Sequence, residues 1–192
     1  MGWRSSPGFL KKDNLIDGTY TQNNYLDFPR TKLINLSLKH PNIIDAKFVQ
    51  PLVQMDDNQL KNMFMKSGYV GQRLSIVDQL QYKYQMLIDG NTSSWTRAYW
   101  QIFSNSVIFK QESNNIQWYY NYLQPFVHYI PVKHDLSDLV EKIEWAQAHN
   151  DSIQKIIENA NNFAYNNLQY EDLLLYMYLT LNEYAKLQKF RI

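Results

Sequence analysis

Short segments rich in β-branched and aromatic residues alternate with segments in which apolar residues recur every three or four positions. The first kind occurs at residues 85–89, 106–111 and 127–132, and a helix is predicted between the first two, over residues 94–105. Strands that alternate with helices in this way form parallel sheets, because the crossover between parallel strands is usually helical. The pattern therefore predicts an α/β fold, with a Rossmann-like parallel sheet covered by helices on both faces.

The flanking segments extend this pattern. Residues 42–49 are a further strand candidate, and helices are predicted over residues 29–41 and 75–85. After the segment at 127–132, Asp135 and Asp138 resemble a capping arrangement at the start of a helix. Two C-terminal helices complete the prediction: the first has a stripe of Ile153, Ile156, Ile157, Ala160, Phe163 and Ala164, and the last carries Leu173, Leu174, Met177, Leu181 and Tyr184.

Length and composition favour one globular domain. The chain has 192 residues, of which 45% are hydrophobic, and this is enough to bury a substantial core. We expect a single domain over residues 1–192, with an irregular segment of interdomain type over residues 1–28 and the core over residues 29–192. Residues 51–71 have no clear period and predict no element.

Charge and cysteine content exclude several classes of function. The formal net charge is +1, which gives no basis for a nucleic-acid partner. The chain has no cysteine, which excludes disulfides, thiolate nucleophiles and cysteine-ligated zinc, and its four histidines lack ligand-like spacing, so we expect no metal site. No apolar run approaches the roughly 18 residues that span a bilayer, so no transmembrane segment is expected.

The turn LIDGNTSSWTR, residues 87–97, is the first candidate site. It follows a predicted strand and leads into a helix, whose unpaired backbone N–H groups and partial positive charge attract anions. Ser93, Ser94 and Arg97 add polar and cationic groups there, and Gly90 lets the backbone approach a ligand closely. In the alternative interpretation, a serine caps the helix and Arg97 is solvated.

A second group of residues follows the strand at 106–111. Glu112 and Ser113 stand where a ribose could meet an acidic acceptor, although an exposed loop carboxylate explains Glu112 equally well. Trp118, Tyr119, Tyr120 and Tyr122 form a dense aromatic group that could stack on a sugar or a base, but core packing is favoured for such clusters.

Four stretches resemble glycosyltransferase family 90, which contains lipopolysaccharide-modifying, capsule-associated and protein O-glucosyl or O-xylosyl transferases. They cover most of the chain in the family's order. They are WRSSPG at 3–8, PRTKLINLSLKHPNIIDAKF at 29–48, YKYQMLIDGNTSSWTRAYWQIFSNSVIFKQES at 82–113 and WYYNYLQPFVHYIPVKHDLSDLVEKIEWAQAHND at 118–151.

The resemblance implies an architecture for the whole enzyme. Family members have two Rossmann-like domains that face a cleft, the GT-B arrangement, and the C-terminal domain holds a nucleotide sugar, commonly UDP-linked, with no essential metal. We therefore expect this chain to be the donor-binding C-terminal half. We expect the N-terminal acceptor domain to be absent from it, and a separate chain is a possible source of that domain.

The resemblance also assigns site residues. Arg4, in the position of the arginine of a WRG or FRG signature, is expected at the donor diphosphate together with Ser94 and Arg97. Asp89, Gly90, Ser93, Glu112 and Ser113 are expected around the same pocket. The family usually has Gly after its signature arginine, where this chain has Ser5. The catalytic residue stays unknown, because the acidic residue expected to deprotonate the acceptor belongs to the N-terminal domain.

Two functional hypotheses follow. The first is a glycosyltransferase that moves glucose or xylose from a UDP-linked donor to a hydroxyl of a glycan, lipopolysaccharide or protein, without a cofactor. The alternative is a catalytically inactive nucleotide-sugar-binding remnant or interaction module. A cytoplasmic location is expected, because the N-terminus does not resemble a signal peptide and a glycan on the sequon at Asn91 would occupy the candidate turn.

Overall fold

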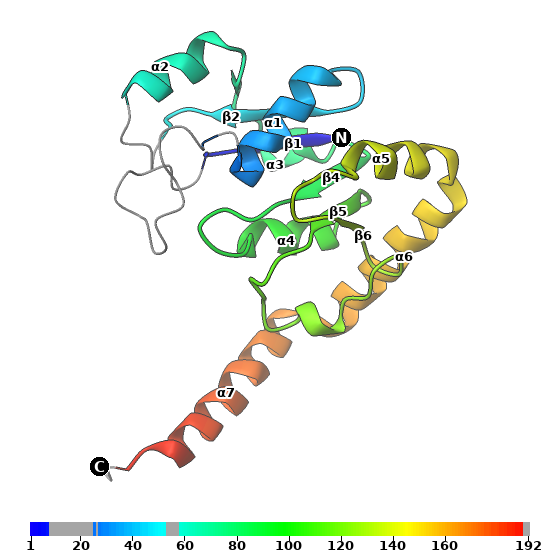
Figure 1. The fold of residues 1–192 in the computed structure, drawn as a ribbon. Coiled ribbons are helices and arrows are strands. Elements are labelled where there is room, and N and C mark those ends of the chain that lie inside the picture. The colour runs from blue at the N-terminus through cyan, green and yellow to red at the C-terminus, as the bar shows by residue number, and fades with distance from the viewer. Residues whose placement is uncertain (8–24, 26, 53–57, 190–192) are drawn as a thin grey trace.

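The computed structural model describes residues 1–7, 25, 27–52 and 58–189, and within them six parallel strands form one sheet with helices on both faces (Figure 1). This confirms the predicted α/β fold class. The strands are β1 (Gly2–Ser5), β2 (Asp45–Val49), β3 (Val70–Gly71), β4 (Tyr84–Leu87), β5 (Val107–Gln111) and β6 (Ile130–Val132). The helices are α1 (Pro29–Lys39), α2 (Asn58–Lys66), α3 (Ile76–Gln79), α4 (Trp95–Ile102), α5 (Leu139–Ala148), α6 (Asn150–Asn167) and α7 (Tyr170–Leu187), with a 3-10 turn η2 (Tyr120–Tyr122).

The strand order β3-β2-β1-β4-β5-β6 reverses at β1. The chain first adds β2 and β3 on one side of β1 and then β4, β5 and β6 on the other, so Gly2 of β1 pairs with Asp45 of β2 and with Gln85 of β4. Sheets of this kind bind ligands outside the carboxyl ends of the strands, at the point where the order reverses. The fold therefore directs attention to the segments that follow β1 and β4.

The sheet is buried on both faces. Met86 of β4 and Phe109 of β5 belong to a core cluster with residues of α1 and α5, whereas Leu87 and Ile108 face a second cluster with α4. α6 contributes to both clusters, and its predicted apolar stripe is buried apart from Phe163, which is only partly buried. Burial on both faces explains why these strands are near-continuous apolar runs in the sequence.

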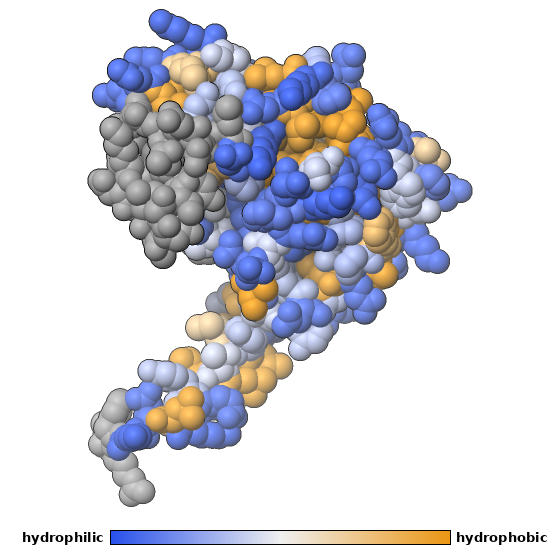
Figure 2. Space-filling view, viewed as in Figure 1, coloured by the Kyte–Doolittle hydropathy of each residue, from blue (hydrophilic) through white to orange (hydrophobic). Residues whose placement is uncertain are grey.

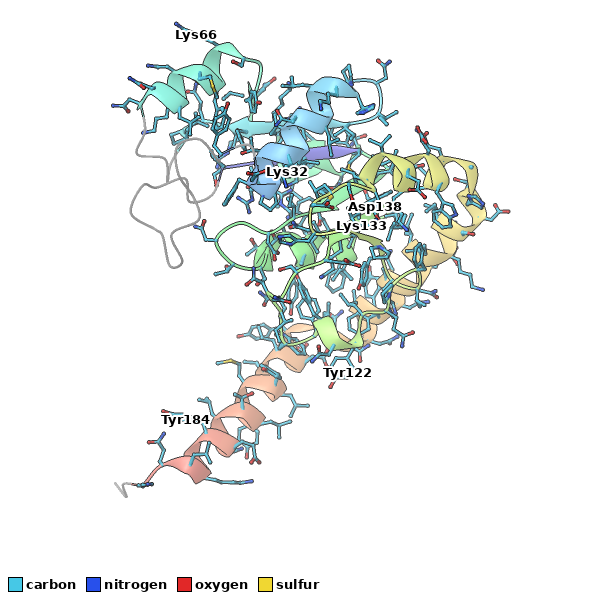
Figure 3. All side chains as sticks on the ribbon, viewed as in Figure 1. Lys32, Lys66, Tyr122, Lys133, Asp138 and Tyr184 are labelled. Carbon is cyan, nitrogen blue, oxygen red and sulfur yellow. The ribbon has the colours of Figure 1, made fainter. Side chains whose placement is uncertain are left out.

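α7 extends away from the body of the molecule (Figure 1). None of its residues is buried, although the helix carries many large apolar side chains, and Figure 2 shows apolar side chains along its visible surface. Tyr184, near its end, projects from the helix far from the sheet (Figure 3) and is 61% exposed.

The start of the chain differs from its prediction. An irregular segment is predicted over residues 1–28, but Gly2–Ser5 form β1, which is central in the sheet. The reason is long-range, because β1 is fixed by its pairing with β2 along its whole length, and four residues with one large apolar side chain carry little local signal. Residues 8–24 and 26 of the predicted segment lie outside the described residues.

The helix predicted over residues 75–85 is also wrong beyond its first turn. Ser75 caps α3 by accepting a hydrogen bond from the backbone N–H of Asp78, but the helix ends at Gln79. Tyr84 then pairs with Val107 of β5, so strand pairing and burial override the helical spacing. In the unassigned segment 51–71, the structure places α2 and β3.

The expected capping pair before α5 is not formed. The Asp135 carboxylate accepts a hydrogen bond from the backbone N–H of Ser137, and the Asp138 carboxylate accepts one from that of Lys133 (Figure 3). Between them Leu136 is buried with a positive φ of 63°. The two aspartates thus stabilise a tight loop that inserts Leu136 into the core, rather than closing the helix end.

Candidate functional site

A polar hollow of about 300 Å³ lies at the carboxyl ends of β1 and β4, where the strand order reverses. Its walls come from the end of β1, the first turn of α1 and the turn between β4 and α4. Every residue predicted for that turn, apart from Asp89, lines it. The lining residues are Ser5, Ser6, Arg30, Gly90, Asn91, Thr92, Ser93, Ser94, Thr96, Arg97 and Trp100.

Arg30, in the first turn of α1, is a site residue that is not among those predicted from the sequence. Its Nε donates a hydrogen bond to the carbonyl oxygen of Asp89 at 2.9 Å, and its Nη1 donates to that of Ser6, also at 2.9 Å. An atom in the Cβ position of Gly90 would lie 2.3 Å from Nη2 of Arg30. The missing side chain at Gly90 therefore makes room for the guanidinium.

The sequence does contain a signal for Arg30. A cation in the first turn of a helix opposes the helix dipole, and α1 has no acidic residue in that turn to compensate. Residues that break a local rule in this way are often functional.

Arg97, in the first turn of α4, reaches back across the hollow. Its Nη1 donates to Oε1 of Gln79 at 2.9 Å, and its Nη2 donates to the carbonyl oxygen of Arg4 at 2.5 Å. These contacts tie the start of α4 to β1 and to α3. The interpretation of Arg97 as a freely solvated side chain is therefore wrong.

Arg30 and Arg97 form a pair of like charges. Burial lowers the pKa of Arg30 to about 10, against a smaller opposing effect of the Asp89 charge, and burial together with the charge of Arg30 lowers the pKa of Arg97 to about 10. Both guanidinium groups are thus charged at neutral pH. Neither forms an ion pair with a carboxylate of any residue that the structure describes. Such a pair is an electrostatic match for an anion with several oxygens.

The two serines do not cap α4. The Ser94 hydroxyl donates to the carbonyl oxygen of Ile88 at 2.6 Å, and the Ser93 hydroxyl accepts a hydrogen bond from Nε2 of Gln117. The capping interpretation of these serines is therefore wrong. Because the N-cap residue Ser94 makes no side-chain hydrogen bond to the first turn of α4, its hydroxyl does not compete with an anion for the N–H groups there.

Arg4 is placed differently from the expectation. Its Nη2 binds both carboxylate oxygens of Asp45, at 2.8 and 2.7 Å, and its side chain is only 10% exposed. Burial acts to raise the pKa of Asp45, but hydrogen bonds from Arg4 and Tyr82 and nearby positive charges lower it overall. The Arg4 guanidinium does not line the hollow that contains Ser94 and Arg97. Only its carbonyl oxygen takes part, as the acceptor for Arg97.

Of the five residues predicted around the pocket, Gly90 and Ser93 line the hollow, whereas Asp89, Glu112 and Ser113 do not. The Asp89 carboxylate accepts hydrogen bonds from the Ser113 hydroxyl and from Nδ2 of Asn115, at 3.0 Å for the latter, so it joins the turn after β4 to the loop after β5. Glu112 is exposed beside this loop, and the interpretation of its carboxylate as a ribose acceptor stays open. Asp89 and Ser113 thus support the site from behind its lining.

A second, apolar hollow of about 610 Å³ adjoins the first. Thr96 and Trp100 line both hollows, and Gln117 lines the second while it binds Ser93 in the first. Its size is in the usual range for small-molecule sites. It is lined by Thr96, Tyr99, Trp100, Phe103, Gln117, Trp118 and Leu173.

The aromatic group predicted from the sequence divides between core and surface. Tyr119 and Tyr120 are buried in the core beside α4, as favoured. Trp118 lines the apolar hollow and stacks on Tyr176 of α7, with ring centroids 4.8 Å apart, whereas Tyr122 is 67% exposed (Figure 3). Trp118 is therefore the member of the group that is placed to contact a ligand.

A model of the protein family described as glycosyl transferase family 90 matches residues 18–192. The chain belongs to this family. It is 33% identical to protein O-glucosyltransferase 2 of Danio rerio over 159 residues, which cover 83% of this chain and 30% of the relative. It is 31% identical to human protein O-glucosyltransferase 1 over 164 residues, which cover 85% of this chain and 40% of the relative, and 30% identical to human protein O-glucosyltransferase 3 over 159 residues, which cover 83% and 30%.

The aligned part of this chain thus covers less than half the length of each of these relatives. Among its described residues, no group of three His, Cys, Asp or Glu side chains is arranged to hold a metal ion. Across the same residues, the search for a helix of sufficient length and hydropathy to cross a membrane finds none.

Proposed function

We propose that the polar hollow holds the diphosphate of a nucleotide-sugar donor, and that this chain is the donor-binding part of a glycosyltransferase. The observation that carries the proposal is the pair of guanidinium groups, Arg30 and Arg97, which face one hollow without an ion-pairing carboxylate among the described residues. The start of α4, which the Ser94 side chain does not cap, adds its N–H groups and its dipole on the same side. Membership of family 90 supports this function.

The proposed chemistry needs stabilisation of a departing anion. In glycosyl transfer, an acceptor hydroxyl attacks the anomeric carbon of the sugar while the bond from that carbon to the diphosphate oxygen breaks. The electron pair of that bond leaves with the nucleoside diphosphate, and the hydroxyl proton passes to a base. Arg30 and Arg97 would stabilise the charge that develops on the diphosphate, because preorganised donors act most strongly where charge appears in the transition state. Two guanidinium groups can serve in place of a metal, so we propose a metal-independent reaction.

The base is not assigned to this chain. Asp89 lies next to the lining residue Gly90 in the chain, but its carboxylate accepts hydrogen bonds from Ser113 and Asn115 and joins two loops behind the lining of the hollow. We therefore propose that the base comes from an acceptor-binding domain in a GT-B arrangement. That domain belongs either to the rest of a longer polypeptide or to a separate chain.

The relatives narrow the proposed substrates. They are named protein O-glucosyltransferases, which favours glucose as the sugar and a protein hydroxyl as the acceptor. UDP-glucose is therefore the proposed donor, with UDP-xylose as a second donor and a glycan or lipopolysaccharide as alternative acceptors. The cytoplasmic location stays a prediction.

Calorimetric titration of the folded chain with UDP, UDP-glucose and UDP-xylose in the presence of EDTA tests the proposal. Saturable binding that is lost in Arg97→Ala supports a metal-independent donor site. Absence of binding by a chain that circular dichroism shows to be folded would refute a donor site in this chain. Binding without glucose transfer to any hydroxyl, even after addition of the acceptor domain of a relative, would instead support the nucleotide-binding remnant.

A further inference from the structure

Trp3 lies beneath both arginines of the polar hollow. It is the second residue of β1 and is 1% exposed. The guanidinium carbon of Arg30 is 5.7 Å from the centroid of its ring, and that of Arg97 is 6.0 Å from it. Both distances are within the range over which a cation is attracted to an aromatic face.

The charges of the two arginines repel each other, so contacts that attract a cation offset this repulsion. Arg97 has a second contact of this kind, with the Trp100 ring at 5.5 Å, but Trp3 is the ring that contacts both arginines. Their hydrogen bonds to Ser6, Asp89, Gln79 and Arg4 all go to neutral oxygens, namely three backbone carbonyls and one side-chain amide. A carboxylate in their place would hold the arginines, but it would also cancel the charge that an anion requires. An aromatic face attracts a cation through its quadrupole and leaves the net charge unchanged.

The indole has a cost that a benzene ring would avoid. Nε1 of Trp3 is buried and has no hydrogen-bond acceptor among the described residues. A buried donor without a partner destabilises the fold. A phenylalanine at this position would remove that N–H, but tryptophan is the strongest of the aromatic side chains in contacts with cations.

We propose that Trp3 is a positioning residue, whose ring holds Arg30 and Arg97 side by side in a charged state that a diphosphate then binds. This inference rests on the proposed donor site. It assigns to the aromatic residue before Arg4 a role that acts through the two arginines, without contact with the donor.

Four variants test the inference through the dissociation constants of UDP and of inorganic diphosphate. Trp3→Leu should weaken binding of both probes about tenfold, equivalent to 1.4 kcal/mol, while Trp3→Phe should retain binding to within about threefold. Phe48→Leu is the matched core control, because Phe48 packs edge-on against Trp3, with centroids 6.2 Å apart, in the same core cluster. It should lower the melting temperature and leave both dissociation constants unchanged. Arg97→Ala is the reference variant, because it gives the loss of affinity when one guanidinium is removed completely.

A further measurement keeps the test valid if Trp3→Leu does not fold. Site-specific replacement of Trp3 by a polyfluorinated tryptophan keeps the shape of the ring and reduces the negative charge of its face. It should weaken diphosphate binding severalfold, whereas the same replacement at Trp145 of α5, which stacks on His149, should not. Equal binding by fluorinated and ordinary Trp3 would overturn the inference, as would equal affinities of Trp3→Leu and Phe48→Leu. If the folded wild-type chain binds neither probe, the proposed function itself fails, and the inference fails with it.

Discussion

The guanidinium of Arg30 occupies the space that a side chain on Gly90 would fill. A Cβ atom on Gly90 would lie 2.3 Å from Nη2 and 2.6 Å from Cζ of Arg30, closer than non-bonded atoms approach. Among the described glycines, only Gly68 has a positive φ, so the backbone at Gly90 accepts an L-residue. The demand for glycine at position 90 thus comes from the guanidinium and not from the turn itself.

The first prediction follows from this contact. Gly90→Ala should fold normally but displace the Arg30 guanidinium, and should weaken UDP binding at least tenfold, because the loss of one charge-assisted hydrogen bond costs about 1.5–3 kcal/mol. Titration calorimetry measures the affinity. Gly68→Ala is the control, since its positive φ of 74° should make alanine cost about 1 kcal/mol of stability without an effect on UDP binding. Unchanged affinity in Gly90→Ala would show that the position of Arg30 is irrelevant to the donor.

A second prediction concerns the two arginines. Arg97→Ala and Arg30→Ala should each weaken binding of UDP-glucose by about 10- to 100-fold, the range expected for one charge-assisted hydrogen bond. Arg97→Lys should be intermediate, because lysine keeps the charge but lacks the planar fork through which Arg97 donates from Nη1 to Gln79 and from Nη2 to Arg4. Arg73→Ala, at an exposed arginine after β3, should have no effect. A comparable loss in Arg73→Ala would mean that only general electrostatic attraction had been measured.

Much of the fold could be predicted from the sequence because its signals are local. The apolar runs at β4 and β5 are buried on both faces, so each has a composition typical of a parallel strand. β1 has no such signal, since only its pairing with β2 over four residues identifies it as a strand. α3 shows the opposite error, because helical spacing continues through Tyr84 although that residue pairs with β5. Tertiary pairing decided both cases.

For the same reason, the sequence predicts only the part of the candidate site that lies in one continuous segment. Ser93, Ser94 and Arg97 belong to one turn, and the order of strand, glycine, hydroxyls and cation predicts an anion site there. Arg30 reaches that turn from α1, through a hydrogen bond to Asp89, and no local pattern reports a contact across that separation in the chain. Arg4 illustrates the converse, because a sequence motif does not reveal that Asp45 binds its guanidinium.

A third prediction tests the role of Arg4 through the pH dependence of stability. The pKa of Asp45 is lowered in the folded chain from its ordinary value of 3.8, so its charge stabilises the fold above that pH, and the contribution is lost as the pH falls through the folded pKa. Asp45→Asn should lower the melting temperature at pH 7 by about 2–4 °C, the shift that ~1 kcal/mol produces in a chain of this size. The difference from wild type should shrink below pH 3.8.

Glu158→Gln, at an exposed glutamate of α6, is the control for Asp45→Asn and should show no such difference at any pH. Calorimetric scans from pH 2 to pH 7 provide the measurement. UDP affinity of Asp45→Asn at pH 7 should stay close to wild type, because the Arg4 guanidinium is outside the hollow. A large change in UDP affinity with little change in stability would instead indicate that Arg4 takes part in donor binding.

The last prediction separates the two hollows. If the nucleoside of the donor extends from the diphosphate past Trp100 into the apolar hollow, Trp118→Ala should weaken UDP binding about tenfold, because base stacking on an aromatic side chain is worth about 1–3 kcal/mol. Binding of inorganic diphosphate should not change, since Trp118 does not line the polar hollow. Tyr122→Ala removes an aromatic side chain that is 67% exposed and lines neither hollow, so it controls for non-specific effects. Equal losses for UDP and diphosphate would indicate that Trp118 acts through the fold of the loop, and no loss for UDP would exclude the apolar hollow as the nucleoside site.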